Sequence, residues 1–171
     1  LLSIILLSLL TQFHNQMKNL SATLSFLLMT IAMADALAAP QKVVVSGAGG
    51  QTGQSLFRKL LALPHEFQPL GLVRSAESKA ALVASGVASG NIAVVDVTNS
   101  DAVRAVVGED VAAFCICTSA KPAPTSEVTA EGRPIFGFPN GVPELVDWQG
   151  QKNQIDACPP GSHVVVCSTM G

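Results

Sequence analysis

The sequence GAGGQTG at 47–53 combines residue types and spacing that suit the binding of a phosphate group. It directly follows a β-branched run at 42–46 (KVVVS) and precedes a segment with apolar residues at helical spacing. A turn without Cβ atoms lets a phosphate approach the backbone, and the amides that begin a helix carry partial positive charge. This strand–turn–helix context predicts a pyrophosphate site formed by Gly47, Gly49, Gly50, Gln51, Thr52 and Gly53.

Arg74 indicates which dinucleotide such a turn would take. It follows the apolar run PLGLV, about 20 residues beyond the glycine turn, where dinucleotide-binding folds place the residue that reads the adenosine ribose. An acidic residue would accept hydrogen bonds from a free 2′-hydroxyl, whereas arginine pairs with a 2′-phosphate. We therefore expect NADP(H) in preference to NAD(H), the alternative being a solvated surface arginine. A P-loop is excluded because no Lys-Ser or Lys-Thr follows the glycines.

Polar residues also follow two further apolar runs. Asp96 comes after NIAVV, and Thr118 with Ser119 comes at the end of VAAFCICT. Asp96 suits either an adenine-facing position or a turn before the next helix. Thr118 and Ser119 either line the ribose and nicotinamide side of a cofactor or begin the long connection at 120–143. Because long connections in compact domains are usually functional, that segment is of interest as well.

The elements that would position these residues alternate between strand and helix. The candidate strands are continuous apolar runs without polar alternation, so both faces of their sheet should be buried. We therefore expect an α/β fold, a doubly wound parallel sheet of the Rossmann-like kind, with functional residues at the carboxyl ends of the strands. The predicted strands are 42–46, 69–73, 91–95, 111–118 and 163–167, and the predicted helices are 51–63, 76–85, a short one from a capping box at 98–101 to Gly108, and 146–158.

The composition excludes several other classes of protein. Ten basic against 12 acidic residues, a formal net charge of −2, gives no general attraction for nucleic acid. The 49% of hydrophobic residues excludes a disordered tail. The four cysteines form no CxxC pair, which argues against a zinc site, and no metal is expected. We predict that Trp148 packs its helix onto the sheet and that the cysteines are buried thiols: Cys115, Cys117, Cys158 and Cys167.

The apolar excess of the chain is concentrated before residue 39. Read from Met17, the sequence has a short basic start, an apolar centre and small residues at Ala36–Ala38, which is the layout of a cleavable secretory signal peptide. The alternative is a membrane anchor, and any membrane contact would be confined to this segment. We predict a presequence at 1–38 and a dinucleotide-binding domain at 39–171. The predicted destination is the secretory pathway. Two alternatives are import into a complex plastid and, if the first residues are artefactual, the cytoplasm.

Seven longer stretches resemble one known family, the atypical, NAD(P)-binding (NmrA-like) short-chain dehydrogenase/reductases of plant and algal type. The resemblance runs from residue 43 to 171 but corresponds to the first part of such a domain. Because the chain also stops directly after an apolar strand, we expect a further, C-terminal part of the domain to be missing. The matching stretches are SGAGGQTGQ (46–54), GLVRSAESKAAL (71–82), VVDVTNSDAV (94–103), CTSAKP (117–122), EGRPIF (131–136), VDWQGQKNQIDA (146–157) and VVVCSTMG (164–171).

The resemblance also implies roles for individual residues. Active relatives carry a substrate-facing hydroxyl at the position of Ser168, followed by a Tyr-x-x-x-Lys pair that handles the proton. This sequence has no tyrosine, so the resemblance supports cofactor binding better than turnover. The cofactor contacts that it implies are phosphate at the glycine turn, 2′-phosphate at Arg74, adenine at Asp96 and Val97, and the inner cofactor at Thr118 and Ser119.

Three functional hypotheses remain at this stage. The first is an NADP-dependent reductase that transfers hydride to a small organic substrate. The second is a non-catalytic NADP(H)-sensing or scaffold protein, in which the nucleotide controls docking to a partner. The third is a luminal protein, held by its signal segment, whose fold has lost nucleotide binding. A homo-oligomer is compatible with all three.

Overall fold

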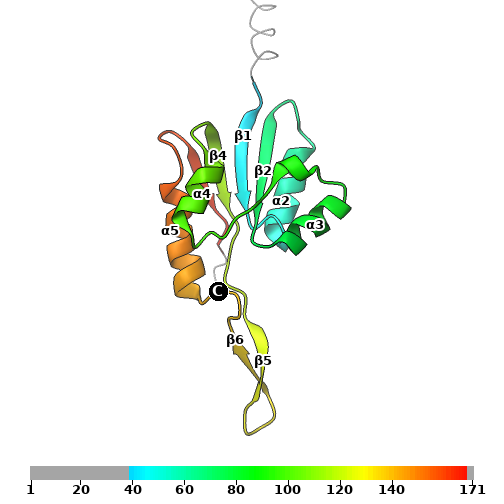
Figure 1. Ribbon diagram of the computed structural model, residues 1–171, viewed down its shortest axis with the longest axis vertical. Coiled ribbons are helices and arrows are strands. Elements are labelled where there is room, and N and C mark those ends of the chain that lie inside the picture. Colours follow the sequence, from blue (N-terminus) through cyan, green and yellow to red (C-terminus); the bar gives the residue numbers. More distant parts are fainter. Residues whose placement is uncertain (1–38, 169–171) are drawn as a thin grey trace, which may run out of the picture. The chain divides into compact units, whose positions relative to one another are not determined.

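The computed structural model describes residues 39–168 (Figure 1). The predicted presequence at 1–38 lies outside the described residues, as do positions 169–171. The strands are β1 (Gln41–Ser46), β2 (Phe67–Val73), β3 (Ile92–Val94), β4 (Val111–Ile116), β5 (Ala123–Val128), β6 (Pro134–Gly137) and β7 (His163–Val166). The α-helices are α2 (Gln51–Leu61), α3 (Ala76–Ala84), α4 (Ser100–Val107) and α5 (Gly150–Asp156), with a 3-10 turn at Ser89–Asn91 and a π-helical turn at Glu144–Gln149.

Five of the strands form one parallel sheet, in the order β3-β2-β1-β4-β7. From β1, the central strand, the chain proceeds through β2 to β3 on one side and then returns to β4 and β7 on the other (Figure 1). The predicted doubly wound α/β sheet is confirmed. The order of the strands therefore reverses between β1 and β4, and ligands of open α/β sheets bind outside the carboxyl ends of strands at such a point.

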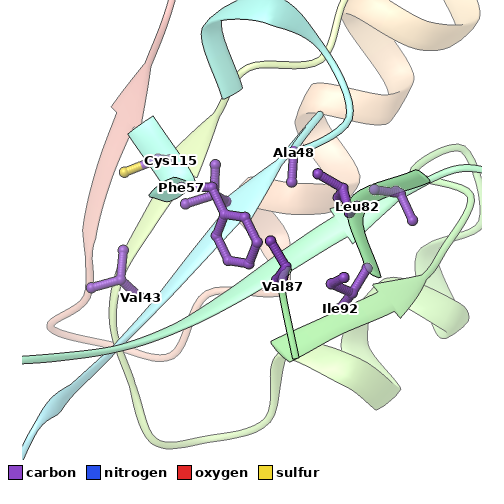
Figure 2. Packing of buried hydrophobic residues seen from close by; sticks show 9 residues of the cluster. Val43, Ala48, Phe57, Leu82, Val87, Ile92 and Cys115 are labelled. Carbon is purple, nitrogen blue, oxygen red and sulfur yellow. The ribbon is translucent and has the colours of Figure 1, made fainter. Parts of the chain in front are cut away.

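Successive residues of β1 face opposite sides of the sheet, as strand geometry requires. Val43 and Val45 belong to the core that includes Phe57 of α2 and Leu82 of α3, whereas Val44 belongs to the core on the other face. Figure 2 shows the first of these clusters, with the fully buried ring of Phe57 among its other members. The second contains residues of α4, and Ala157 and Cys158, which follow α5, pack against it. Helices thus cover both faces, which explains why the strands are continuously apolar.

The connection at 120–143 contains a two-stranded antiparallel ribbon, β5 and β6, which the sequence analysis did not predict. Figure 1 shows this ribbon as separate from the parallel sheet. Most of its residues are exposed, including Val128 and Phe136. Its turn closes at Gly132, whose φ of +76° is a conformation that glycine adopts most readily.

Several predicted details differ from the structure. Helix α2 ends at Leu61, two residues before the predicted end, and β4 ends at Ile116 instead of residue 118. The cap of α4 is Asn99, whose side chain accepts from the amides of Asp101 and Ala102, whereas the predicted box began one residue earlier. The predicted helix at 146–158 is instead a π-helical turn followed by α5.

The prediction that Trp148 packs its helix onto the sheet is wrong, because this side chain is 74% exposed. The prediction of buried thiols holds fully for Cys115; Cys117 and Cys158 are half-buried and Cys167 is exposed. The apolar residues of β7 were also predicted to be buried, but Val164, Val165 and Val166 are exposed in the described residues. No helix within 39–168 has the length and apolar character that crossing a membrane requires.

Candidate functional site

The glycine turn packs so closely that side chains are excluded at two of its positions. Gly47 has a φ of +66°, and a Cβ there would lie 2.6 Å from the carbonyl oxygen of Cys117. A Cβ on Gly53 would lie 2.3 Å from the carbonyl oxygen of Gly47. The same oxygen accepts a hydrogen bond from the amide of Gly50 at 2.8 Å. These contacts fix the turn against the ends of β1 and β4 and explain the glycine spacing seen in the sequence.

Helix α2 presents its amino end beside this turn. Its N-cap is Gly50, which supplies no side-chain hydrogen bond, and its first turn contains no acidic residue. The first amides of an α-helix have no intrahelical acceptor, and the helix dipole adds partial positive charge there. The amides of Gln51, Thr52 and Gly53 are therefore suited to an anion. Gly50 itself has extended backbone (φ −87°, ψ 166°), a conformation open to any residue, so its lack of a side chain leaves space rather than relieving strain.

The carboxyl ends of β1 to β4 surround a pocket of about 170 Å³. The structure places four predicted site residues away from its lining: Gln51, Thr52 and Gly53 lie in the first turn of α2, and the exposed Ser168 follows β7. The predicted residues that line the pocket are Gly47, Gly49, Gly50, Arg74, Asp96, Val97, Thr118 and Ser119. Further polar residues that line it, none of them named above as a cofactor contact, include Ser78, Thr98, Lys121 and Asn140.

Arg74 lies at the rim of the pocket, where β2 ends. Its Nη1 donates to the carbonyl oxygen of Asn140 at 3.0 Å, which connects it to the segment that returns from the β5–β6 ribbon. Beside it, the hydroxyl of Ser75 accepts from the amide of Ser78 at 3.2 Å and caps α3, as the sequence predicted. One donor of the guanidinium is thus used within the chain, and the side chain remains exposed to an incoming ligand.

Asp96 forms a turn and also lines the pocket. Its Oδ1 accepts from the amide and the hydroxyl of Thr98 at 2.9 and 2.8 Å. The same segment is held from α5, because Nδ2 of Asn153 donates to the carbonyl oxygens of Val97 and Thr98, both at 3.0 Å. Oδ1 of Asn153 in turn accepts from Gln149 at 2.8 Å. Asp96 therefore forms the turn before the next helix and also lines the pocket, so its two predicted roles, in a turn and facing an adenine, are compatible.

Residues before and within α5 also hold the segment that follows β4. The completely buried Gln154 donates through Nε2 to the hydroxyl oxygen of Thr118 at 3.1 Å and to the carbonyl oxygen of Gly150 at 2.9 Å. Oδ1 of Asp147 accepts from the amide of Ala120 at 2.7 Å. Because the Thr118 oxygen accepts from Gln154, its own proton is free to point toward a ligand in the pocket. The sequence analysis did not predict the roles of Asp147, Asn153 and Gln154. The feature that could have indicated them is a set of polar residues on the buried face of the helical segment.

The cysteines near the pocket are not suited to nucleophilic catalysis. Cys117 lines the pocket, and its Sγ lies 3.4 Å from that of Cys167. Burial, with a smaller contribution from the hydrogen bond to Cys167, raises the pKa of Cys117 to about 12. Burial also raises the pKa of Cys115 and of Cys158. A thiolate is the reactive form, so these three groups are unreactive near neutral pH. Among residues 39–168, no three His, Cys, Asp or Glu side chains gather in a way that could hold a metal ion.

Comparison with solved structures identifies the class of fold. A short-chain dehydrogenase from Streptomyces avermitilis superposes with a TM-score of 0.53 and 18% identity, covering 77% of this chain and 49% of that one. A serine dehydrogenase, solved as a complex with NADP+, gives a TM-score of 0.52 and 18% identity, covering 74% and 53% of the two chains. At these identities the comparisons define the fold: the chain has the Rossmann-like fold of short-chain dehydrogenases.

Two curated proteins are similar to the chain in sequence. Sanguinarine reductase of Eschscholzia californica is 36% identical over 151 residues, which covers 75% of this chain and 54% of the reductase. An uncharacterized, chloroplastic protein of Arabidopsis thaliana is 38% identical over 137 residues, covering 77% of this chain and 41% of that protein. The chain thus spans about half the length of the curated relatives it matches. No family model matches the sequence.

Proposed function

We propose that this chain binds NADP(H) and forms the cofactor-binding part of a reductase of the short-chain dehydrogenase/reductase family, within its atypical, NmrA-like group. The observation that carries the proposal is one pocket at the strand-order reversal, with a glycine turn at one end and Arg74 at its rim. The similarity to sanguinarine reductase and the shared fold with an NADP+-complexed dehydrogenase support it.

The residues present fit such a cofactor. A side chain at Gly50 would lie between the Gly47 oxygen and Lys121, at 3.2 and 3.9 Å from its Cβ, where a pyrophosphate would approach the turn. The amides of Gln51, Thr52 and Gly53 would donate to its oxygens, with Gly47 and Gly49 keeping the approach free of Cβ atoms. The remaining contacts that we propose are the 2′-phosphate at Arg74, the adenine at Asp96 and Val97, and the nicotinamide side at Thr118 and Ser119.

The proposed activity is hydride transfer between the nicotinamide and a small organic substrate. The cofactor supplies the hydride chemistry, and the residues of this chain bind and orient it. The hydroxyl oxygen of Thr118 accepts a hydrogen bond from Gln154, so its O–H group would donate a hydrogen bond to a cofactor oxygen. We propose Ser168, at the carboxyl end of β7, as a substrate-facing hydroxyl, because the carboxyl ends of β4 and β7 lie at the same edge of the sheet.

Calorimetric titration of the full chain with NADP+ tests the proposal. The informative variant is Gly50→Val, because the extended backbone at this residue suits valine, although its Cβ would make a tight contact of 3.2 Å with the Gly47 oxygen. We expect at least a tenfold loss of affinity with a cooperative thermal melt retained. The matched control is Gly90→Val, since a Cβ at Gly90 would meet nothing within 4 Å. Equal affinity of Gly50→Val and the unaltered chain would refute the placement of the pyrophosphate.

We further propose that residues 1–38 are a cleavable presequence that directs the domain at 39–171 into the secretory pathway, with a plastid as one destination. The signal-peptide layout read from Met17 supports this proposal. A fusion of residues 17–42 to a fluorescent protein tests it. Entry into the endoplasmic reticulum, with cleavage after Ala38, is expected, and a fusion that stays in the cytoplasm would contradict it.

A further inference from the structure

We propose that Lys121 is a second cationic residue of this site and binds the cofactor's pyrophosphate together with the amides of α2. This inference rests on the proposed dinucleotide binding and adds a ligand residue to it. Lys121 lies in the segment that leaves β4 for the β5–β6 ribbon, far from the glycine turn in sequence.

The position of the ammonium group carries the inference. Lys121 lines the same pocket as Gly47, Gly49 and Gly50. A Cβ placed on Gly50 would lie 3.9 Å from Nζ of Lys121 and 3.2 Å from the carbonyl oxygen of Gly47. The ammonium therefore lies beside the glycine turn, close to the position that a Gly50 side chain would take.

The backbone leading to Lys121 is held in place. The preceding residue, Ala120, donates its amide to Asp147 at 2.7 Å, and Thr118 is engaged by the buried Gln154 at 3.1 Å. Both partners belong to the helical segment at 144–156. In this proposal Asp147 is a positioning residue, because it holds the backbone just before Lys121 and does not line the pocket.

The local charges also favour an anion at this point. The ion pairs of residues 39–168 join Lys42 to Asp110 and Lys152 to Asp156, so neither engages Lys121. Asp96, an acidic residue of the pocket lining, directs Oδ1 to Thr98. Within residues 39–168 the ammonium therefore lies near the N-cap of α2 with no carboxylate paired to it. A doubly charged diphosphate between the two would interact favourably with both.

Lys121 and Arg74 should then affect affinity in different ways. The pyrophosphate is common to NAD+ and NADP+, so the loss of Lys121 should weaken both to the same extent. Arg74 would contact the additional 2′-phosphate, which NADP+ alone carries. The ratio of the two affinities consequently separates the two roles.

The test is calorimetric titration of the full chain with NAD+ and NADP+, comparing Lys121→Met with Lys59→Met. Lys59 lies in the last turn of α2, so this control removes the same charge from the far end of that helix. We expect Lys121→Met to weaken both dinucleotides by about tenfold, the equivalent of one charge-assisted hydrogen bond, and Lys121→Arg to recover most of that loss. Lys59→Met should bind as the unaltered chain does.

Two results would overturn the inference while leaving dinucleotide binding intact. One is unchanged affinity of Lys121→Met for both dinucleotides. The other is a loss confined to NADP+, which would place Lys121 at the 2′-phosphate. If the unaltered chain bound neither dinucleotide, the proposed function would fail as well, so the two failures are distinguishable.

Discussion

Replacement of Arg74 by glutamine should convert the site from a preference for NADP+ to indifference between the two dinucleotides. The guanidinium has five N–H donors, and one of them is used by the carbonyl oxygen of Asn140 at 3.0 Å. The others are available to a 2′-phosphate. A glutamine amide keeps a polar group at the rim of the pocket but removes the charge.

The size of the effect follows from the exposure of this residue. Charge-assisted hydrogen bonds contribute about 1.5–3 kcal/mol, and because Arg74 is exposed we take the lower half of this range. Arg74→Gln should therefore bind NADP+ about 10–50-fold more weakly, while the affinity for NAD+ changes less than about twofold. The free energy of unfolding should fall by no more than about 0.5 kcal/mol, since a single exposed hydrogen bond is lost.

Calorimetric titration with both dinucleotides measures this difference. A suitable control is Arg58→Gln, because Arg58 lies on α2 and donates to Ser85 at 2.7 Å, outside the pocket lining. The control should leave both affinities unchanged. If Arg74→Gln lowered the affinities for NAD+ and NADP+ by the same factor, the assignment of the 2′-phosphate to Arg74 would be refuted.

Three further predictions concern stability and thiol chemistry. Gly53→Ala should destabilise the chain by about 1–3 kcal/mol, because its Cβ would lie 2.3 Å from the Gly47 oxygen; an unchanged melting temperature would contradict the described turn. Phe57→Ala should lower the free energy of unfolding by about 3–5 kcal/mol in denaturant titrations, since this ring is fully buried, and a loss below about 1 kcal/mol would argue against that core. With the pKa of Cys117 raised to about 12, its alkylation by iodoacetamide should accelerate about tenfold per pH unit from pH 7 to 10, whereas a plateau near pH 9 in mass-spectrometric mapping would contradict its burial.

The glycine turn and the strand ends could be predicted from the sequence, because the local sequence patterns agree with the geometry of a parallel sheet. Continuous apolar runs specify strands buried on both faces, and parallel strands bring their carboxyl ends to one edge of the sheet. Arg74, Asp96 and Thr118 each follow such a run, and all three line the pocket described above. The glycine spacing is a local signal, which can be recognised without knowing which distant residues contact the turn.

The parts that could not be predicted depend on contacts between distant segments. Arg74 and Asn140 are separated by 66 residues, and nothing near either one in the sequence indicates their contact. The hydrogen bond between Ala120 and Asp147, in the backbone just before Lys121, is likewise created by tertiary packing. Trp148 shows the converse case: it was expected in the core but is exposed, whereas Val146 in the same π-helical turn is buried.

A crystal structure of the full chain grown with NADP+ tests the central claim most directly. The account predicts a diphosphate within hydrogen-bond distance of the amides of Gln51, Thr52 and Gly53, with the 2′-phosphate at the guanidinium of Arg74. A dinucleotide bound elsewhere on the chain, or a diphosphate separated from the glycine turn by a protein side chain, would contradict it.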